Sequence, residues 1–293
     1  MSTSKIKARS PDTVKAGKFK CVLFGEPGVG KTWSALQFPK VVLFDTEGGA
    51  TGSQYMKLLK ESNGLYLGIE DGSLSFDFLL DQVAALSTEK HDRRTLVIDS
   101  ITKIFTNCVA LEMERLGDKD QFGASKKKAV SYMRRLLMAL SRINMNVIII
   151  AHSETVWGLV NGQRAEVGKG PSIHTAATYD LDLVLHAQKR GPQRVVSVTK
   201  SRLLGFPDGD TFPLSYDDLA ARFGKEAIES EGEVVVMATP AQVSEVKALL
   251  EVVKVSEADL QKGFDKAGVT EFAEMTGVQI EGWLTFLKKK IST

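Results

Sequence analysis

Residues 25–32 carry the side chains best suited to phosphate chemistry. Their sequence, GEPGVGKT, fits G-x-x-x-x-G-K-[ST] and lies between an apolar run, KCVLF, and a helix-like stretch, TWSALQF. In such a loop the backbone N–H groups surround phosphate oxygens, Lys31 reaches the β and γ phosphates, and Thr32 offers a hydroxyl to Mg²⁺. We therefore predict a site for ATP and Mg²⁺. The expected nucleotide contacts are Gly25, Glu26, Pro27, Gly28, Val29, Gly30, Lys31, Thr32 and Trp33.

Two acids that follow apolar runs could complete this site. Asp99 ends TLVID, where a carboxylate would orient Mg²⁺ through its water shell, and Ser100 follows where many ATPases place a second acid. Glu47 comes just after VVLF, on the loop side of its strand, and could polarise a water toward the γ phosphate. The alternatives are a strand-end turn for Asp99 and a solvated loop for Glu47.

The elements that must position these residues alternate regularly from residue 19 onward. Short β-rich runs that are apolar on both faces, separated by helix-length segments, predict a largely parallel sheet covered by helices. We therefore expect an α/β domain that ends near residue 215. The runs are FKCVLF, VVLF, LYLGI, TLVID, NVIIIA, LDLVLHA and RVVSVTK.

Four segments divide the chain of 293 residues, which is long enough to bury one large core and a small satellite. Residues 1–18 are polar and basic and predict a flexible tail, and residues 19–215 form the α/β core. Residues 216–238 are interpreted as a linker. Residues 239–293 predict a small helical domain.

Capping signals define the helices of the last segment. Thr239 with Gln242, and Thr276 with Gln279, have the spacing of capping boxes, and Pro240 fits a first helical turn. Apolar residues at helical spacing follow each box and predict the buried faces. These are Val243, Val246, Leu249, Leu250 and Val253 in the first helix, and Ile280, Trp283, Leu284 and Leu287 in the last.

Composition narrows the class of protein. A formal net charge of only +2 means that a nucleic-acid surface would have to be a local patch. Cys21 and Cys108 lie in apolar contexts without metal-ligand spacing, which favours reduced thiols in a cytoplasm. No apolar run approaches the roughly 20 residues that a membrane span needs, so we expect neither secretion nor membrane insertion.

The order of four motifs resembles the catalytic core of the RecA/RadA recombinase superfamily, including reduced phage members that act as single-strand annealing ATPases. The motifs, GEPGVGKT, FDTEGG, LVIDS and SYMRRLLMALSRINMNVIIIAH, span roughly residues 19–205. The resemblance implies a RecA-like P-loop NTPase core in which Glu47 is the catalytic glutamate and Asp99 the magnesium acid. Because AAA-plus ATPases carry a contiguous acid pair, Ser100 argues against that group.

The resemblance also assigns a γ-phosphate sensor. In the family, a glutamine usually ends the strand that corresponds to VIIIAHSE and passes the signal to a DNA-binding loop, whereas this chain has His152 in that position. An imidazole can donate to phosphate, but its charge depends on pH. The alternative is a histidine satisfied by neighbouring backbone groups.

A projecting hairpin is expected after His152. Asn161 and Gly162 are a strong type I′ turn signal between TVWGLV and QRAEV. This interval holds the second DNA-binding loop of the family, which implies that Trp157, Arg164 and Lys169 offer a stacking ring and cations to single-stranded DNA. Packing of Trp157 against the sheet is the alternative.

Two further basic groups are candidates. The interval LGDKDQFGASKKKAV matches the first DNA-binding loop of the family in position. Lys126, Lys127 and Lys128 open the helix that follows, although a lysine triplet is more often only a solvated face. Lys200 and Arg202 stand two apart on a predicted strand and so point to the same side. Basic residues here in related recombinases reach the γ phosphate of a neighbouring subunit, which implies a homo-oligomer. The alternative is exposed cations on an edge strand.

These expectations combine into a phage-type, ATP-dependent single-stranded DNA-binding recombination protein that promotes annealing or strand pairing. A second hypothesis is a nucleotide-switched mediator whose helical domain recruits a single-strand-binding protein or another recombination partner. A RecA-type helicase is a third, which the absence of a recognisable helicase amino-terminal domain disfavours.

Overall fold

The computed structural model describes residues 17–120, 123–232 and 237–291. Within them, eight strands form one sheet in the order β10-β9-β8-β1-β5-β4-β2-β3. The strands from β8 to β3 in this order run parallel, whereas β9 pairs antiparallel with both β8 and β10. The bounds are β1 (Lys20–Gly25), β2 (Val41–Asp45), β3 (Leu65–Leu67), β4 (Thr95–Asp99), β5 (Asn146–Ala151), β8 (Leu183–Arg190), β9 (Gln193–Ser201) and β10 (Thr211–Pro213).

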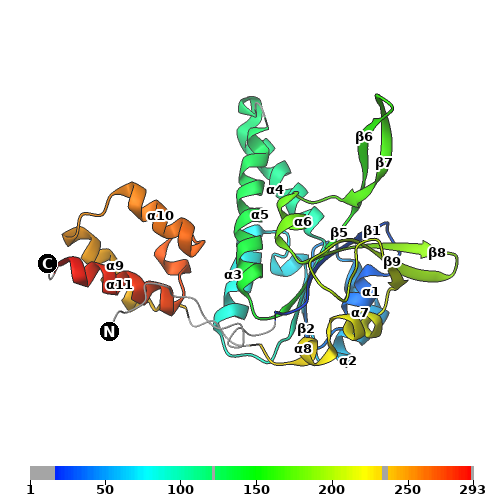
Figure 1. Ribbon diagram of the computed structural model, residues 1–293, viewed down its shortest axis with the longest axis horizontal. Helices are drawn as coiled ribbons and strands as arrows, with labels where there is room; N and C mark the ends of the chain where they lie inside the picture. Colours follow the sequence, from blue (N-terminus) through cyan, green and yellow to red (C-terminus); the bar gives the residue numbers. More distant parts are fainter. Residues whose placement is uncertain (1–16, 121–122, 233–236, 292–293) are drawn as a thin grey trace.

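Helices cover both faces of this sheet (Figure 1). One face packs against α1 (Lys31–Ala35), α2 (Ser53–Glu61), α7 (Tyr216–Phe223) and α8 (Lys225–Glu229). The other face packs against α3 (Phe76–Thr88), α4 (Ile101–Leu116), α5 (Ala124–Arg142) and α6 (Ala176–Asp180). Because both faces are covered, the strands are apolar throughout, as the sequence predicts for a parallel sheet.

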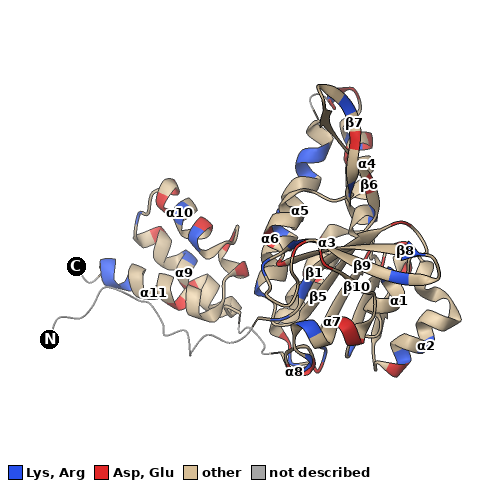
Figure 2. Cartoon of the chain, turned by 45° about the vertical axis from the view of Figure 1, so that its right-hand side comes forward, with Lys and Arg blue, Asp and Glu red and all other residues tan. Residues whose placement is uncertain are grey.

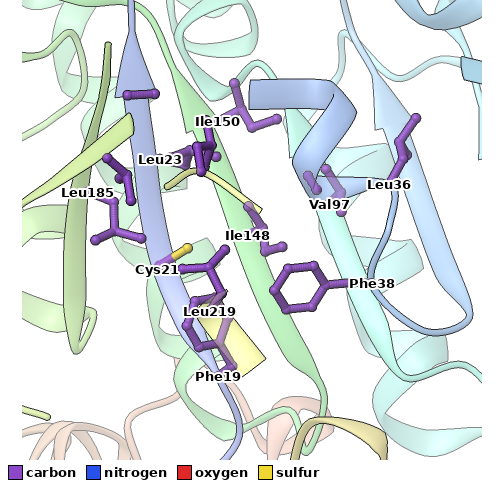
Figure 3. Packing of buried hydrophobic residues seen from close by; sticks show 14 of the residues in the cluster. Phe19, Cys21, Leu23, Leu36, Phe38, Val97, Ile148, Ile150, Leu185 and Leu219 are labelled. Carbon is purple, nitrogen blue, oxygen red and sulfur yellow. The ribbon is translucent and has the colours of Figure 1, made fainter. Parts of the chain in front are cut away.

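The alternation of side chains divides the core into two clusters. Cys21, Leu23 and Leu185 point to the first face, where Phe38 and Leu219 pack against them (Figure 3). Val22 and Phe24, between them in sequence, point to the opposite face. A period of two is the geometry of a strand buried on both sides.

The segment at 216–238 differs from the expected linker. Its first half forms α7 and α8, and Leu219, Ala220 and Ile228 are buried in the first cluster. Lys18, assigned from sequence to the flexible tail, is also fixed, because its Nζ donates to the carbonyl of Ser230 at 2.7 Å. Residues 1–16 of that tail and 233–236 of that linker lie outside the described residues.

A hairpin of β6 (Ser153–Val160) and β7 (Gln163–Pro171) projects from the sheet edge (Figure 1). Its two-residue turn is formed by Asn161 at φ 52° and Gly162 at φ 78°. Positive φ at both positions is the mark of a type I′ turn. The predicted hairpin is therefore confirmed.

The carboxyl-terminal helices are α9 (Pro240–Val252), α10 (Glu257–Ala267) and α11 (Gly277–Ile291), which surround a separate apolar cluster. The capping boxes form as predicted: Gln242 N donates to Thr239 Oγ1 at 3.2 Å, and Gln279 N donates to Thr276 Oγ1 at 3.2 Å. Arg135 of α5 binds Glu274 at 2.8 Å across to these helices. Among the helices described in this structure, none is long and apolar enough to cross a membrane.

Candidate active site

The predicted site residues meet at one edge of the sheet because their strands pair in register. Asp45 lies opposite Asp99 on β2 and β4, and Phe24 lies opposite Ala151 on β1 and β5. The phosphate loop, Glu47, Asp99 and His152 therefore all follow the carboxyl ends of neighbouring strands. This edge is where ligands bind in open α/β sheets.

The phosphate loop joins β1 to α1 with little spare room. A Cβ on Gly25 would stand 2.3 Å from the carbonyl oxygen of Ala187 on β8, so only glycine fits there. Nζ of Lys31 donates to the carbonyls of Gly25 at 2.8 Å and Glu26 at 3.0 Å. Burial lowers the pKa of Lys31, which the nearby carboxylates oppose. The Lys31 ammonium thus lies within the loop, where a phosphate would sit.

The other loop residues differ in exposure. Val29 is buried, whereas Glu26 and Pro27 are exposed. The Trp33 side chain is 42% exposed, and its ring lies 6.4 Å from that of Tyr55 on α2. The predicted contact of Trp33 with nucleotide stays a prediction.

Thr32 and Asp99 form a pair of oxygen ligands that fits Mg²⁺. Oγ1 of Thr32 donates to Oδ2 of Asp99 at 2.6 Å, so a hydroxyl and a carboxylate lie together beside the loop. Burial raises the pKa of Asp99 to about 6. In residues 17–120, 123–232 and 237–291, no group of three or more His, Cys, Asp or Glu could hold a metal ion without further ligands. Because a hydroxyl and a carboxylate both offer oxygen ligands, the pair fits Mg²⁺ that shares its coordination with phosphates and water, as at nucleotide sites.

Glu47 belongs to a three-residue cluster. Its Oε1 accepts from Ser100 Oγ at 2.5 Å and lies 2.5 Å from His152 Nε2, which is 3.3 Å from the same hydroxyl. Burial raises the pKa of Glu47, but the hydrogen bonds from Ser100 and His152 outweigh it, and the net pKa is lowered. Glu47 is therefore an ionised carboxylate beside the phosphate loop. Nε2 of His152 thus contacts the side chains of Glu47 and Ser100. The alternative expected from sequence was a contact with neighbouring backbone groups.

Asp45 holds the Glu47 loop and was not identified from sequence as a functional residue. Its buried carboxylate accepts from the N–H groups of Glu47 at 3.0 Å, Gly48 at 2.8 Å and Ala50 at 2.9 Å. The sequence signal that could have identified Asp45 is an aspartate at a strand end, directly before a glycine-rich turn. Aspartate side chains in this position accept hydrogen bonds from the backbone N–H groups that follow.

Thr46 fastens the same loop to the end of β4. Its N–H donates to the carbonyl of Asp99 at 2.7 Å, and its Oγ1 accepts from the N–H of Ser100 at 2.8 Å. These two hydrogen bonds fix the loops that carry Glu47 and Asp99 relative to each other, and neither bond involves a carboxylate.

Comparison with known proteins agrees with this geometry. Residues 17–205 match the protein family described as an AAA domain, AAA_24. The chain belongs to this AAA-domain family. No curated protein matches the chain. Among solved structures, the RadB recombinase is similar at 16% identity and a TM-score of 0.44, over 66% of this chain and 84% of that one.

The AAA domain of this chain is a P-loop NTPase. The predicted α/β fold, a mostly parallel sheet flanked by helices with further helices at the carboxyl end, is confirmed. Ser100 was expected to argue against AAA-plus ATPases, but the chain matches a family described as an AAA domain, so this residue does not exclude an AAA domain. Ser100 follows Asp99 and donates to Glu47, a carboxylate that follows another strand, β2.

Lys200 and Arg202 lie away from the phosphate loop of their own AAA domain. Lys200 Nζ and Arg202 Nη2 both donate to the carbonyl of Tyr179, at 3.4 and 2.6 Å, which confirms that they point to the same side. Ser201 pairs with Leu183, which pairs with Cys21 at the start of β1. The two cations therefore lie at the opposite end of the strands from the nucleotide site.

The hairpin exposes its candidate DNA contacts. The Trp157 side chain is 55% exposed, and the Arg164 guanidinium lies 5.1 Å from its ring centroid. Lys169 is engaged locally, with Nζ 2.8 Å from Thr155 Oγ1 and 3.6 Å from Glu166. Trp157 does not pack against the large sheet, so the alternative for this residue is not observed.

The lysine triplet opens α5 on the side of the AAA domain from which the hairpin projects (Figure 2). Lys126, Lys127 and Lys128 are all exposed. Lys128 is paired with Glu112 at 3.6 Å and lies 6.0 Å from the Tyr132 ring centroid. The end of the α4–α5 pair and the β6–β7 hairpin thus flank one side of the molecule.

Proposed function

We propose that this AAA-domain protein is an ATP-dependent, single-stranded DNA-binding recombination protein that hydrolyses ATP at subunit interfaces and promotes annealing or strand pairing. The observation that carries the proposal is the Glu47–His152 contact. It joins the carboxylate beside the phosphate loop to the residue that directly precedes the projecting hairpin.

Each side chain of the site has a separate role in the proposed hydrolysis of ATP. Thr32 and Asp99 would hold Mg²⁺, which neutralises charge on the β and γ phosphates when bound. When nucleotide binds, Nζ of Lys31 would donate to phosphate oxygens in place of the carbonyls of Gly25 and Glu26. Glu47, kept ionised by its hydrogen bonds, orients the attacking water and accepts its proton. Ser100 keeps the carboxylate in place.

Hydrogen bonds at the base of the β6–β7 hairpin would couple the nucleotide site to the DNA-binding residues. The N–H of Ser172 donates to the carbonyl of His152 at 2.8 Å, and Thr102 Oγ1 accepts from the N–H of His152 at 3.1 Å and donates to the carbonyl of Ser172 at 2.8 Å. A γ phosphate that draws His152 from Glu47 would therefore move both strands of the hairpin. We infer that the bound nucleotide changes the positions of Trp157 and Arg164 in this way.

An oligomer would complete the site. Because Lys200 and Arg202 lie far from their own phosphate loop, they could contact phosphate only in a second copy of the chain. Cations supplied in this way stabilise the transition state for phosphoryl transfer.

The test is ATP turnover by the full chain with and without single-stranded DNA, with electron microscopy of the product assemblies. We expect turnover that DNA stimulates and that Lys31→Ala abolishes. No hydrolysis in the presence of DNA, or full activity of Lys31→Ala, would refute the proposal. A forked duplex serves as control, because robust ATP-driven unwinding would favour a helicase instead.

A second candidate is a recombination mediator that recruits a partner through α9–α11. These helices have their own apolar core, and they expose Val278 (85%) and Phe286 (45%). Deletion of residues 239–293 separates the candidates. Lost recruitment of a single-strand-binding protein with intact ATPase would favour the mediator, whereas unaltered annealing would favour the first function.

A further inference from the structure

The β8–β9 hairpin carries two cations onto the phosphate loop of its own chain. A Cβ built on Gly30 would lie 2.8 Å from Cδ and 3.1 Å from Nε of Arg194, and one built on Gly28 would lie 3.9 Å from Nζ of Lys189. Both basic side chains therefore lie against the loop that would hold phosphate. Figure 1 shows this hairpin extending from the sheet on the side of α1.

Lys189 and Arg194 are direct cross-strand partners, and so they point to the same face of the hairpin. Like charges in this position destabilise a strand pair. Across residues 17–120, 123–232 and 237–291, neither side chain has a hydrogen bond or an ion pair that would offset the repulsion. The tip between them, RGPQ, adds Arg190 and no acid. The pair therefore costs stability unless an anion lies between the two charges.

We propose that Lys189 and Arg194 bind the polyphosphate of the nucleotide from within the same chain, as a cationic cover over the phosphate loop. This inference rests on the proposed function, because the anion is the nucleotide that Lys31 also binds. An arginine suits the role, since its planar guanidinium can make paired hydrogen bonds to phosphate oxygens. These residues are distinct from Lys200 and Arg202, which lie at the other end of the sheet.

Gly30 supports the assignment from the side of the loop. Its φ of 96° favours glycine, and the Arg194 side chain occupies the space that a side chain at position 30 would need. The absence of a side chain at position 30 therefore allows Arg194 to approach the phosphate loop closely.

The test compares Lys189→Ala and Arg194→Ala with Arg190→Ala in the full-length protein. Arg190 is the matched control, because it precedes the same turn but points to the opposite face of the hairpin. Affinities for fluorescent methylanthraniloyl derivatives of ATP, ADP and AMP are measured by titration. Thermal melting is recorded with and without ATP.

We expect Arg194→Ala and Lys189→Ala each to weaken ATP binding by roughly tenfold or more, as for the loss of a hydrogen bond between charged groups. AMP binding and Arg190→Ala should change little. Melting of the nucleotide-free variants should stay the same or rise, because a repulsion is removed, while the increase produced by ATP should shrink.

Three outcomes would overturn the inference: equal weakening in all three variants, no weakening in any, or a fall in melting temperature without nucleotide. Lys31→Ala is measured in parallel. If Lys31→Ala abolishes ATP binding while the hairpin variants behave like wild type, only this inference fails. If Lys31→Ala binds ATP normally, both the proposed function and this inference fail.

Discussion

Oε1 of Glu47 lies 2.5 Å from Nε2 of His152, although the two residues follow strands that are separated by β4. The same oxygen accepts from Ser100 at 2.5 Å. A single carboxylate oxygen is thus shared between a residue next to the magnesium acid and the residue at the base of the hairpin. If the proposed function is correct, we expect this contact to couple hydrolysis to DNA binding.

Glu47→Gln should keep ATP binding and lose turnover. The amide cannot accept a proton from water, and a positioned general base contributes about a hundredfold or more to the rate. Single-turnover hydrolysis together with nucleotide titration separates the two effects. Glu89→Gln, at the exposed end of α3, is the control and should behave like wild type. Weaker binding with normal turnover would contradict the role given to Glu47.

His152→Ala should lower the stimulation of hydrolysis by single-stranded DNA more than hydrolysis without DNA. Alanine cannot carry a signal between Glu47 and the hairpin. His152→Gln restores a side chain that donates a hydrogen bond and should recover most of the stimulation. The ratio of turnover with and without DNA is the measurement. Equal ratios in both variants and wild type would exclude the coupling.

Asp99→Asn should raise stability while it removes activity. Burial raises the pKa of Asp99 from 3.8 to about 6, so the folded protein holds a proton that the unfolded chain releases. Stability therefore falls as pH rises from about 4 to about 6. At 1.36 kcal/mol for each pH unit, the ionised carboxylate costs about 3 kcal/mol near pH 8.

Urea unfolding in EDTA, without nucleotide, measures this effect. The stability gain of Asp99→Asn should be greatest near pH 8 and vanish near pH 4, whereas the exposed Asp118→Asn should show no such trend. A variant that is less stable than wild type at pH 8 would show that the carboxylate stabilises the fold.

Trp157→Ala should weaken binding of single-stranded DNA by about 1–3 kcal/mol, as for the loss of one stacked base. Trp157→Phe keeps an aromatic face and should lose less. The paired change of Lys126 and Lys127 to Ala should instead reduce the salt dependence of binding, because phosphate contacts release counterions. Fluorescence anisotropy at several salt concentrations checks both. Unchanged affinity in all variants would place the DNA elsewhere.

Lys200→Ala should be inactive alone and regain activity when mixed with Lys31→Ala. In a mixed assembly, the intact phosphate loop of the first variant receives Lys200 from the second. A mixture of Lys31→Ala with Asp99→Asn should stay inactive, because both changes affect the same site. Lack of recovery in the first mixture, with assembly verified by light scattering, would exclude a role across subunits.

Much of the fold was predictable because the sheet is covered on both sides. Its strands are continuous apolar runs, and each of the seven runs identified in the sequence overlaps a strand. β10 escaped prediction because Thr211–Pro213 is three residues long and pairs only with β9. α7 and α8 were taken for a linker, since their polar composition conceals Leu219 and Ile228, the residues that anchor them.

The location of a candidate site residue could be predicted where a local sequence motif specifies it. It could not be predicted where pairing between distant strands brings the residue to the site. Lys31, Thr32 and Asp99 follow from local patterns. Asp45 escaped because its function is to accept backbone N–H groups, which leaves only a short sequence signal. Lys189 and Arg194 escaped because only the register of β8 with β1 and β9 brings them to the phosphate loop.

The β6–β7 hairpin leaves and rejoins the ATPase core at almost one point, since the N–H of Ser172 reaches the carbonyl of His152 at 2.8 Å. We therefore expect residues 153–171 to be replaceable as a unit. Evolution or an engineer could graft another binding element onto the same two ends and redirect the ATPase to a different polymer without rebuilding its hydrolytic centre.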